Sequence, residues 1–396
     1  MPDAVIVSAA RTAIGTARKG SLADIDVFEL AKASIGEALK RSSVPAEDVD
    51  DIIMGESLQG GGCVARYAAV DLGLTDVPGL AHNRHCASGM APIQTAAAGI
   101  RAGMDRVVIA GGAESITQSP TVMKKLPGSY AGVEPWLSPS HPATPDAPTM
   151  DMSITVGWNT AVKAGVSREE QDDWAYHSHM RAVAATDEGR LRDEIFAMEV
   201  PVRGKRGETR TFDVDEHPRR DTTPEKLAKL PPLHPEIDGF SITAGNSSGL
   251  NDAGCAVVVA DRDYAEEHAL EPLAIVRSWA SVGVPPRDTG LAPTLAIPKA
   301  AERAGVTVAD LDLVEINEAF AAMAVASSRI LGLPHEIVNV NGSGCSLGHP
   351  VAATGARMVA TTIFELRRRG GGLGCVSMCA GGGMGSATVL EVLPAS

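Results

Sequence analysis

Cys86 is the residue whose type and position in this sequence best suit covalent chemistry. It lies in residues 83–90, directly before a run of small residues, 91–102, that predicts a helix. A thiol at a helix N-terminus faces unpaired backbone N–H groups and the positive end of the helix dipole, so its pKa falls and the thiolate is favoured. We therefore predict that Cys86 is a nucleophile. The competing interpretation is a small buried apolar residue, which is the usual role of a free cysteine.

Three segments far downstream favour the chemical interpretation. Each supplies a polar group that thiol chemistry uses, and glycines in most of them let a ligand approach the backbone closely. The groups are the amide of Asn317 in residues 317–321, the imidazole of His349 in residues 342–350 and the thiol of Cys379 in residues 379–385. As isolated residues, His349 and Cys379 would more often be structural. Their value as candidates comes from the combination.

The four segments, in this order, resemble the thiolase family, the coenzyme A-dependent acyltransferases that form or cleave 3-ketoacyl-CoA. The resemblance runs from residues 5–12 to the C-terminal glycines. It implies that Cys86 attacks a thioester to give an acyl-enzyme and that His349 takes the thiol proton. It also implies that Cys379 removes a proton from the methyl carbon of a second acetyl-CoA, which then condenses with the acyl group.

The resemblance also assigns groups that stabilise negative charge on oxygen. One oxyanion hole is implied for His349 together with a water held by Asn317. A second is implied for the backbone N–H groups of Cys86 and Gly381. Glycine suits position 381 because a side chain there would crowd the thioester. Phe320 is expected to line the acyl pocket, with plain packing as the alternative.

Residues 118–240 differ in texture from the rest of the chain, because proline and charge become frequent. Such a long insertion is usually a lid or a binding region, and in thiolases the corresponding loop domain covers coenzyme A. Arg219 looks like the thiolase arginine that meets the nucleotide of coenzyme A, since a guanidinium stacks on adenine or pairs with phosphate. Ser248 looks like the residue that contacts the pantetheine arm. The alternatives are a solvated surface for Arg219 and a simple turn for Ser248.

The elements that must position these groups follow an alternating pattern. Short apolar runs predict strands, and apolar residues at helical spacing predict helices. Strands are expected at residues 4–9, 51–56, 106–112, 256–260, 273–282, 311–317, 338–341 and 374–378. Helices are expected from Asp26 onward and at residues 65–72, 91–103 and 352–366, with another from a capping box at Ser167 towards Ala185. The alternation predicts α/β layers with helices on the faces of a largely parallel sheet.

The two ends of the chain look like a diverged duplication, because an extended stretch leads into a helix at both Cys86 and His349. That agrees with the thiolase fold, in which two similar α/β units stack into a layered αβαβα core. We expect one core half in residues 1–117, completed by 241–268, an inserted loop domain in 118–240, and the other core half in 269–396.

Composition limits the partners. The formal net charge of −14 disfavours nucleic acid and anionic membrane surfaces, and no apolar run is long enough for a membrane helix. The six cysteines are scattered and lack zinc-ligand spacing, so we expect reduced thiols, no metal and a cytoplasmic location. No cofactor is expected beyond coenzyme A and acyl-CoA as substrates. The family resemblance implies a homodimer or homotetramer.

Some positions depart from the family pattern. Asp151 stands where short-chain biosynthetic thiolases often have histidine, and Thr289 replaces a common methionine. These changes leave acyl chain length and reaction direction open, so acetoacetyl-CoA and longer 3-ketoacyl-CoA both remain candidates. Two other classes stay open as well: a non-catalytic acyl-CoA or lipid-binding protein, and a condensing enzyme that uses acyl carrier protein. Cys379 argues against the latter, which usually has histidine in that place.

Overall fold

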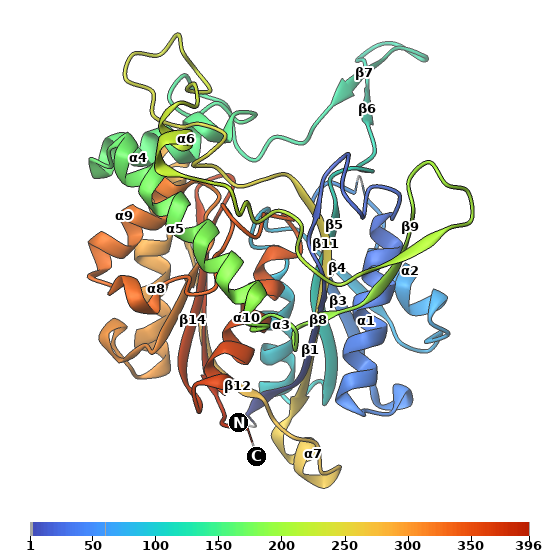
Figure 1. Cartoon of the computed structure of the whole chain (residues 1–396). Helices are drawn as coiled ribbons and strands as arrows, with labels where there is room; N and C mark the ends of the chain where they lie inside the picture. Colours follow the sequence, from blue (N-terminus) through green and yellow to red (C-terminus); the bar gives the residue numbers. More distant parts are fainter. Residues whose placement is uncertain (1–2, 60, 396) are drawn as a thin grey trace.

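The core is a single sheet that divides into two packed halves, with helices outside and between them (Figure 1). The computed structural model describes residues 3–59 and 61–395. The strands follow the spatial order β4–β3–β5–β11–β1–β12–β15–β14–β13. Their bounds in that order are Gly79–His82, Asp51–Gly55, Val107–Ser115, Asn251–Asp261, Ala4–Thr12, Ala274–Gly283, Met384–Val392, Gly372–Ala380 and Leu313–Ile316. Two short strands, β2 (Gly15–Thr16) and β8 (Ile195–Phe196), pair with β11 and β1.

The halves are joined by a narrow seam. β1 pairs with β12 only at Val5 with Ile275 and at Ile6 with Ala274, whereas its pairing with β11 extends from Ala4 to Arg11. The sheet is therefore continuous through a short ladder, and its two halves turn their faces towards each other. Together with the helices this gives the layered α/β architecture that the sequence predicts.

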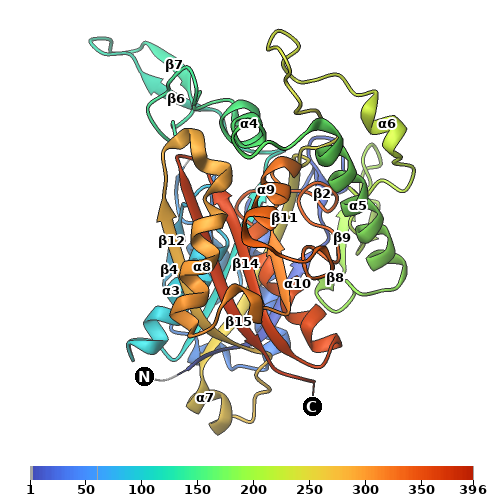
Figure 2. The same cartoon turned by 90° about the vertical axis from the view of Figure 1, so that its left-hand side faces the viewer.

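Helices form three layers around the two halves (Figures 1 and 2). α1 (Val27–Ser42) packs on β1, β5 and β11 from outside, next to α2 (Val64–Asp71). α8 (Pro293–Ala304) covers β12 and β15 on the opposite outer side, beside α9 (Ala321–Leu331). α3 (Met90–Arg101) and α10 (Thr354–Arg368) lie between the halves and contact each other. A last short helix, α7 (Arg262–Glu267), follows β11.

The insertion between β5 and β11 forms small elements of its own. It contains β6 (Val122–Lys125), β7 (Val133–Trp136), the π-helical turn η2 (Ser153–Trp158), α4 (Asn159–Ala164), α5 (Arg168–Asp187), β9 (Met198–Pro201), β10 (Thr209–Phe212) and α6 (Pro224–Ala228). The capping box predicted for α5 is confirmed: Ser167 Oγ accepts from Glu170 N, and Glu170 Oε2 accepts from Ser167 N. The β6–β7 hairpin projects away from the body in both views (Figures 1 and 2).

The expectation of a largely parallel sheet is wrong. β3 is parallel to β4 and β5, and β13 is parallel to β14. The pairs β1–β11, β11–β5, β12–β15 and β14–β15 are antiparallel. β11 returns from the long insertion and enters between β1 and β5 in the opposite direction, while β14 and β15 form a hairpin around residues 381–383. Short apolar runs reveal strands but carry no direction.

The strand predicted at residues 338–341 is also wrong. Only Val338 forms an isolated bridge, with Val314, and Asn339 has a left-handed φ of 48°. The Asn339 side chain instead accepts from Ile316 N at 2.8 Å and donates to Ile316 O at 2.8 Å. The Asn339 amide therefore forms the hydrogen bonds with the backbone of Ile316 that a neighbouring strand would otherwise form.

Candidate active site

Cys86 lies in a tight turn before α3. Ala87 N donates to Arg84 O at 3.0 Å and Ser88 N donates to His85 O at 2.9 Å, and His85 has a left-handed φ of 46°. α3 itself begins at Met90, so Cys86 precedes the first helical residue by a full turn of chain. The backbone N–H groups that reach its sulfur belong to Cys86 itself and to Gly381.

The pKa of Cys86 differs from the sequence-based expectation of a lowered value. Burial, with a smaller contribution from Glu114, raises the pKa of the thiol to about 11. The backbone hydrogen bonds from Gly381 and Cys86 work in the opposite direction but do not offset burial. Desolvation disfavours the charged form of any acid, and it is the largest influence at this site. The resting thiol is therefore protonated at neutral pH.

Cys379 is a neighbour of Cys86. It lies near the end of β14, where its Sγ is 3.5 Å from Met323 Sδ. Burial raises the pKa of Cys379 well above the usual range, and the charge of Cys86 raises it further. Gly381, two residues after Cys379, lies against His85, the residue before Cys86: a Cβ at Gly381 would be 3.5 Å from His85 Cγ. The structure therefore brings the segments of the two predicted thiols together.

His349 is a buried neutral imidazole. Its backbone N–H donates to Asn251 Oδ1 at 3.1 Å, and its Nδ1 lies 2.7 Å from Thr354 Oγ1. Burial, and then the positive charge of Arg357, lower the pKa of His349 to about 3. The ring is therefore uncharged in the resting protein and has the capacity to accept a proton.

Asn317 lies against this imidazole. Its Nδ2 is 3.4 Å from Nε2 and 3.5 Å from Nδ1 of His349, so it contacts the ring without a short bond to either nitrogen. Asn317 is fully buried, and its Oδ1 has no hydrogen-bond partner within residues 3–59 and 61–395. A buried amide oxygen without a partner is a strong acceptor for a water or ligand donor.

The turns that carry Cys86 and His349 are held together by close backbone contacts. A Cβ at Gly89 would lie 2.4 Å from Ala352 O, and one at Gly355 would lie 2.5 Å from Met90 N. The buried carboxylate of Glu114 accepts from Ala352 N at 3.0 Å. The start of α3 and the start of α10 thus meet without side chains between them, which places the nucleophile segment beside the imidazole segment.

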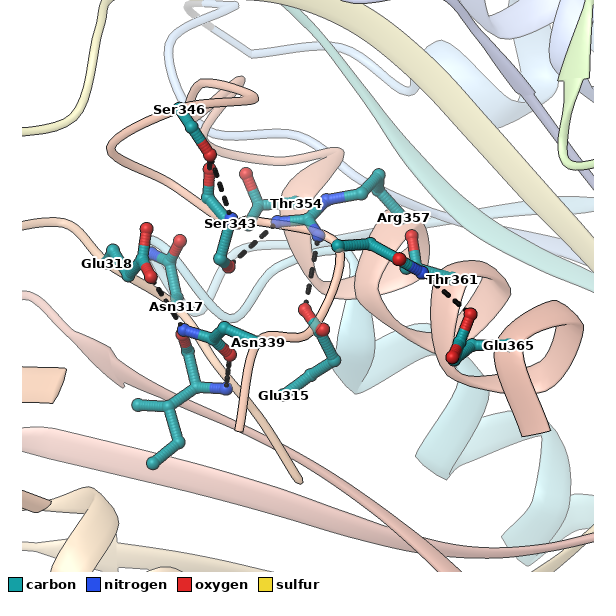
Figure 3. A network of polar contacts seen from close by, with 12 residues as sticks. Glu315, Asn317, Glu318, Asn339, Ser343, Ser346, Thr354, Arg357, Thr361 and Glu365 are labelled. Atoms are coloured by element: carbon teal, nitrogen blue, oxygen red, sulfur yellow. Dashed lines mark hydrogen bonds and ion pairs between the residues drawn. The ribbon is translucent and has the colours of Figure 1, made fainter. Parts of the chain in front are cut away.

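A buried polar network supports the imidazole side of the site (Figure 3). Arg357 of α10 pairs with Glu315 of β13 at 3.4 Å and donates to Ser343 Oγ at 3.3 Å. Burial raises the pKa of Glu315 to about 8 despite the nearby arginine. The network ties α10, β13 and the glycine-rich turn before His349 into one unit.

Glu318 fixes the backbone next to Asn317. Its carboxylate accepts from Trp174 Nε1 at 2.9 Å, Ser178 Oγ at 2.6 Å, Asn339 Nδ2 at 2.8 Å and Cys345 N at 3.1 Å. Two of these donors belong to α5 of the insertion. A buried carboxylate with four donors is well satisfied, so Glu318 connects the insertion to the site.

The predicted binding residues surround the same region. Ser248 N donates to Ala319 O at 3.0 Å, and the buried Phe320 caps α9 directly after the Asn317 segment. Arg219 is exposed, and its guanidinium has no ion pair or hydrogen bond within the described chain. By contrast, Arg220 forms a two-bond pair with Asp187. Of these two arginines, the former is therefore free to meet an anion.

The two positions that depart from the family pattern are satisfied locally. Asp151 pairs with His234 Nε2 at 2.8 Å and accepts from Ser153 Oγ at 2.6 Å. Thr289 is fully buried and donates to Pro286 O at 2.5 Å.

Sequence reasoning missed several residues of the site. His85 and Ser140 lie against Gly381, where a Cβ would be 3.5 Å from His85 Cγ and 3.6 Å from Ser140 Cβ. Glu114 and Thr354 contact the His349 turn. A hydroxyl five residues after the histidine, close to the predicted start of a helix, is the sequence signal that could have identified Thr354.

A partly buried thiol, a buried thiol, a neutral imidazole and an amide oxygen without a partner among the described residues lie between two α/β halves. This combination defines an enzyme that handles acyl groups through cysteine chemistry. Family models for the N-terminal and C-terminal domains of thiolase match residues 4–263 and 270–392. The chain therefore belongs to the thiolase family, and it is an acyltransferase that moves acyl groups between coenzyme A thioesters.

Individual relatives agree over the whole length. The chain is 42% identical over 400 residues to the beta-ketothiolase BktB of Cupriavidus necator, covering 98% of this chain and 99% of the relative. It is 40% identical over 405 residues to the 3-ketoacyl-CoA thiolase of Bacillus subtilis, covering 99% of this chain and 100% of the relative. The crystal structure of the Bacillus anthracis acetyl-CoA acetyltransferase superposes with a TM-score of 0.89 at 37% identity and 99% coverage of each chain.

Proposed function

We propose that this chain is an acetyl-CoA C-acyltransferase in which Cys86 carries the acyl group and Cys379 is the base for carbon–carbon bond formation. The observation that carries the proposal is that the partly buried thiol of Cys86 lies beside the segment of the buried thiol of Cys379. The backbone N–H groups of Cys86 and Gly381 donate to the sulfur of Cys86. Substrates are acyl-CoA and CoA, and no other cofactor or metal takes part.

The first step starts from a neutral pair. As the sulfur of Cys86 attacks the thioester carbonyl, its proton passes to His349, and a new carbon–sulfur bond forms. The backbone N–H groups of Cys86 and Gly381 stabilise the oxyanion. The carbon–sulfur bond to coenzyme A then breaks, and the departing CoA thiolate takes the proton of Cys379. The products of this step are acyl-Cys86, free CoA, a charged imidazole and a Cys379 thiolate.

The second step uses the charges that the first leaves behind. The Cys379 thiolate removes a proton from the methyl carbon of acetyl-CoA, while His349 and a water held by the free Oδ1 of Asn317 stabilise the enolate oxygen. The carbon attacks the acyl group, a carbon–carbon bond forms and the bond to Cys86 breaks. His349 returns its proton to Cys86, which restores both thiols. The reverse sequence cleaves a 3-ketoacyl-CoA.

Binding of coenzyme A is assigned to the insertion and the segment that follows it. The free guanidinium of Arg219 suits the nucleotide, Ser248 suits the pantetheine arm and Phe320 suits the acyl group. We place the loop domain over coenzyme A in residues 118–240. The core halves are then 1–117 with 241–268, and 269–396.

Assembly and location complete the proposal. The exposed apolar side chains of Tyr130 and Val133 lie on the projecting β6–β7 hairpin, and such a surface suits contact with another copy. This supports a homodimer or homotetramer. All six cysteines are free, which supports the reducing environment of the cytoplasm. No helix within the described residues has the length and apolarity needed to cross a membrane.

Replacement of Cys379 separates the two steps. In Cys379→Ala, formation of acetoacetyl-CoA from acetyl-CoA should fall by about 100- to 10,000-fold, as for loss of a general base. Acetylation of Cys86 by acetyl-CoA, measured by mass spectrometry, should still occur, but more slowly, because the CoA thiolate then leaves without the proton of Cys379. The matched control is Cys375→Ala, which changes a buried cysteine on the same face of β14. Equal activity of Cys379→Ala and Cys375→Ala would contradict the assignment of the base.

Chain length is tested with the unaltered protein. Rates of CoA-dependent cleavage of acetoacetyl-CoA and of longer 3-ketoacyl-CoA substrates distinguish a short-chain enzyme from a long-chain one. Absence of cleavage and condensation with every chain length would contradict the proposed function as a whole.

A further inference from the structure

A buried hydroxyl contacts one of the two ring nitrogens of His349, Nδ1. Thr354 is the first residue of α10 and is fully buried. Its Oγ1 lies 2.7 Å from His349 Nδ1 and 2.9 Å from Pro350 O. The hydroxyl therefore sits between an imidazole nitrogen and a main-chain carbonyl.

The two contacts together determine where the ring proton lies. Pro350 O also accepts from Ala353 N and Thr354 N at 2.9 Å each. A threonine hydroxyl at the start of a helix commonly donates to the carbonyl four residues back, so we assign the single hydrogen of Thr354 to Pro350 O. The threonine oxygen must then accept from the ring, which requires a hydrogen on His349 Nδ1. In a neutral imidazole this leaves the lone pair on Nε2.

We propose that Thr354 is a positioning residue that keeps His349 in the Nδ1–H tautomer, so that the ring exchanges protons through Nε2 alone. The inference deepens the proposed function and rests on it for its catalytic meaning. The opposite tautomer would carry a hydrogen on Nε2, and the ring could not accept the proton of Cys86 there. Once the ring is charged, the bond from Nδ1–H to Thr354 becomes charge-assisted and stronger.

The contacts of His349 with Asn251 and Asn317 do not favour one tautomer of the ring over the other. Asn251 Oδ1 accepts from the backbone N–H of His349, not from the ring. Asn317 Nδ2 is nearly equidistant from both ring nitrogens, at 3.4 and 3.5 Å. Among the hydrogen bonds of the described chain, the contact with Thr354 is thus the one that distinguishes Nδ1 from Nε2.

α10 itself offers a matched control. Thr362 is also fully buried, and its hydroxyl has no hydrogen-bond partner within the described residues. Thr354→Val and Thr362→Val make the same isosteric change in one helix, but only the former removes a contact with the imidazole. Thr354→Ser restores a hydroxyl at the same place.

The test compares these variants by kinetics and by ¹⁵N NMR of histidine in the resting protein. The unaltered protein should show a protonated Nδ1 for His349, assigned by comparison with His349→Asn. Thr354→Val should lower kcat for condensation by about 10- to 100-fold, the effect of losing a charge-assisted hydrogen bond, with KM for acetyl-CoA changed by less than about twofold. Thr354→Ser should recover most of kcat, and Thr362→Val should keep it.

Two results would overturn the inference. One is a resting His349 with its hydrogen on Nε2, and the other is a Thr354→Val protein that retains both kcat and the Nδ1–H signal. If Thr354→Val fails to fold, the NMR spectrum of the unaltered protein and the activity of Thr354→Ser still decide. A protein with no acyl transfer at all would refute the proposed function, while its NMR spectrum would separately answer the question of the tautomer.

Discussion

At the residue scale, burial and backbone hydrogen bonds act on Cys86 in opposite directions. Burial raises the pKa of the thiol to about 11, and burial together with Arg357 lowers the pKa of His349 to about 3. Between these values the neutral thiol and the neutral imidazole are both the dominant forms. The thiolate of Cys86 and the charged imidazole of His349 therefore form only when a bound thioester reacts.

Alkylation of Cys86 by iodoacetamide tests this neutral resting pair. Because the reactive species is the thiolate, the rate should rise about tenfold per pH unit below the pKa. The rise should continue towards the pKa of about 11 instead of levelling off near 9.0, the ordinary value for cysteine. The labelled peptide is measured by mass spectrometry, with Cys86→Ala as background. A plateau at or below pH 7 would contradict the neutral pair.

The candidate residues themselves could be predicted from the sequence, but their charge states could not. The motifs identify Cys86, His349 and Cys379 as chemical groups. The expectation of a lowered thiol pKa considered only the helix dipole, whereas the dominant influence is loss of water, which depends on what the rest of the chain places around the sulfur. Thr354 was missed because its role depends on the contact of its hydroxyl with the ring of His349, which exists only in the folded turn.

At the scale of elements, the site depends on two helix starts that touch. Gly89 before α3 and Gly355 in α10 have no side chain to separate the backbones. The four segments with candidate residues then meet because β13 and β14 run parallel and end at the same edge, beside the turns that open the central helices.

Substitution at Gly89 tests this packing. Gly89→Ala places a Cβ 2.4 Å from Ala352 O, so the turns must move apart, and we expect a loss of about 1–3 kcal/mol in the free energy of unfolding. Activity should fall as well, because the Cys86 and His349 turns shift relative to each other. Denaturant unfolding and condensation rates provide the measurements.

The control for this change is Gly283→Ala. A Cβ at this residue, at the end of β12, meets nothing within 4 Å, and its φ is not left-handed. It should therefore leave stability and rate unchanged. Equal behaviour of the two variants would show that close contact of the helix starts is unimportant.

Element positions were predictable where periodicity was strong, and strand direction was not. The helices α1, α2, α3, α5 and α10 lie where the sequence predicts them. The strand expected at residues 338–341 is replaced by the Asn339 side chain. A pattern of apolar residues cannot show that a polar side chain such as that of Asn339 takes the hydrogen-bonding place of a strand.

At the scale of the whole molecule, a buried arginine connects the insertion to the core. Arg11, near the end of β1, donates to Glu194 Oε1 at 2.8 Å and to both carboxylate oxygens of Asp215 at 2.7 and 2.9 Å. All three side chains are buried. The two carboxylates belong to segments before and after β9 and β10, so one guanidinium holds both against the sheet.

Arg11→Leu should destabilise the protein strongly. It leaves two buried carboxylates without their cation, a change that typically costs about 3–5 kcal/mol. The midpoint of urea unfolding measures the effect. Arg220→Leu removes an exposed pair with Asp187 and should not move the midpoint, because water screens such pairs. Similar shifts for both variants would contradict the role given to Arg11.

The overall architecture could be predicted because the resemblance extends along the whole chain, and the layers follow from it. The seam between β1 and β12 and the ion cluster at Arg11 could not, since they depend on pairings between residues far apart in the sequence. Neither the seam nor the ion cluster is marked by a pattern of neighbouring residues in the sequence.

The central claim is that Cys86 forms the acyl-enzyme, and peptide mapping tests it most directly. The protein is mixed with acetyl-CoA, quenched in acid, digested and analysed by mass spectrometry. The account predicts one added acetyl group on the peptide that contains Cys86, and none on that peptide in Cys86→Ala. An unmodified Cys86, or an acetyl group on Cys379 instead, would contradict it.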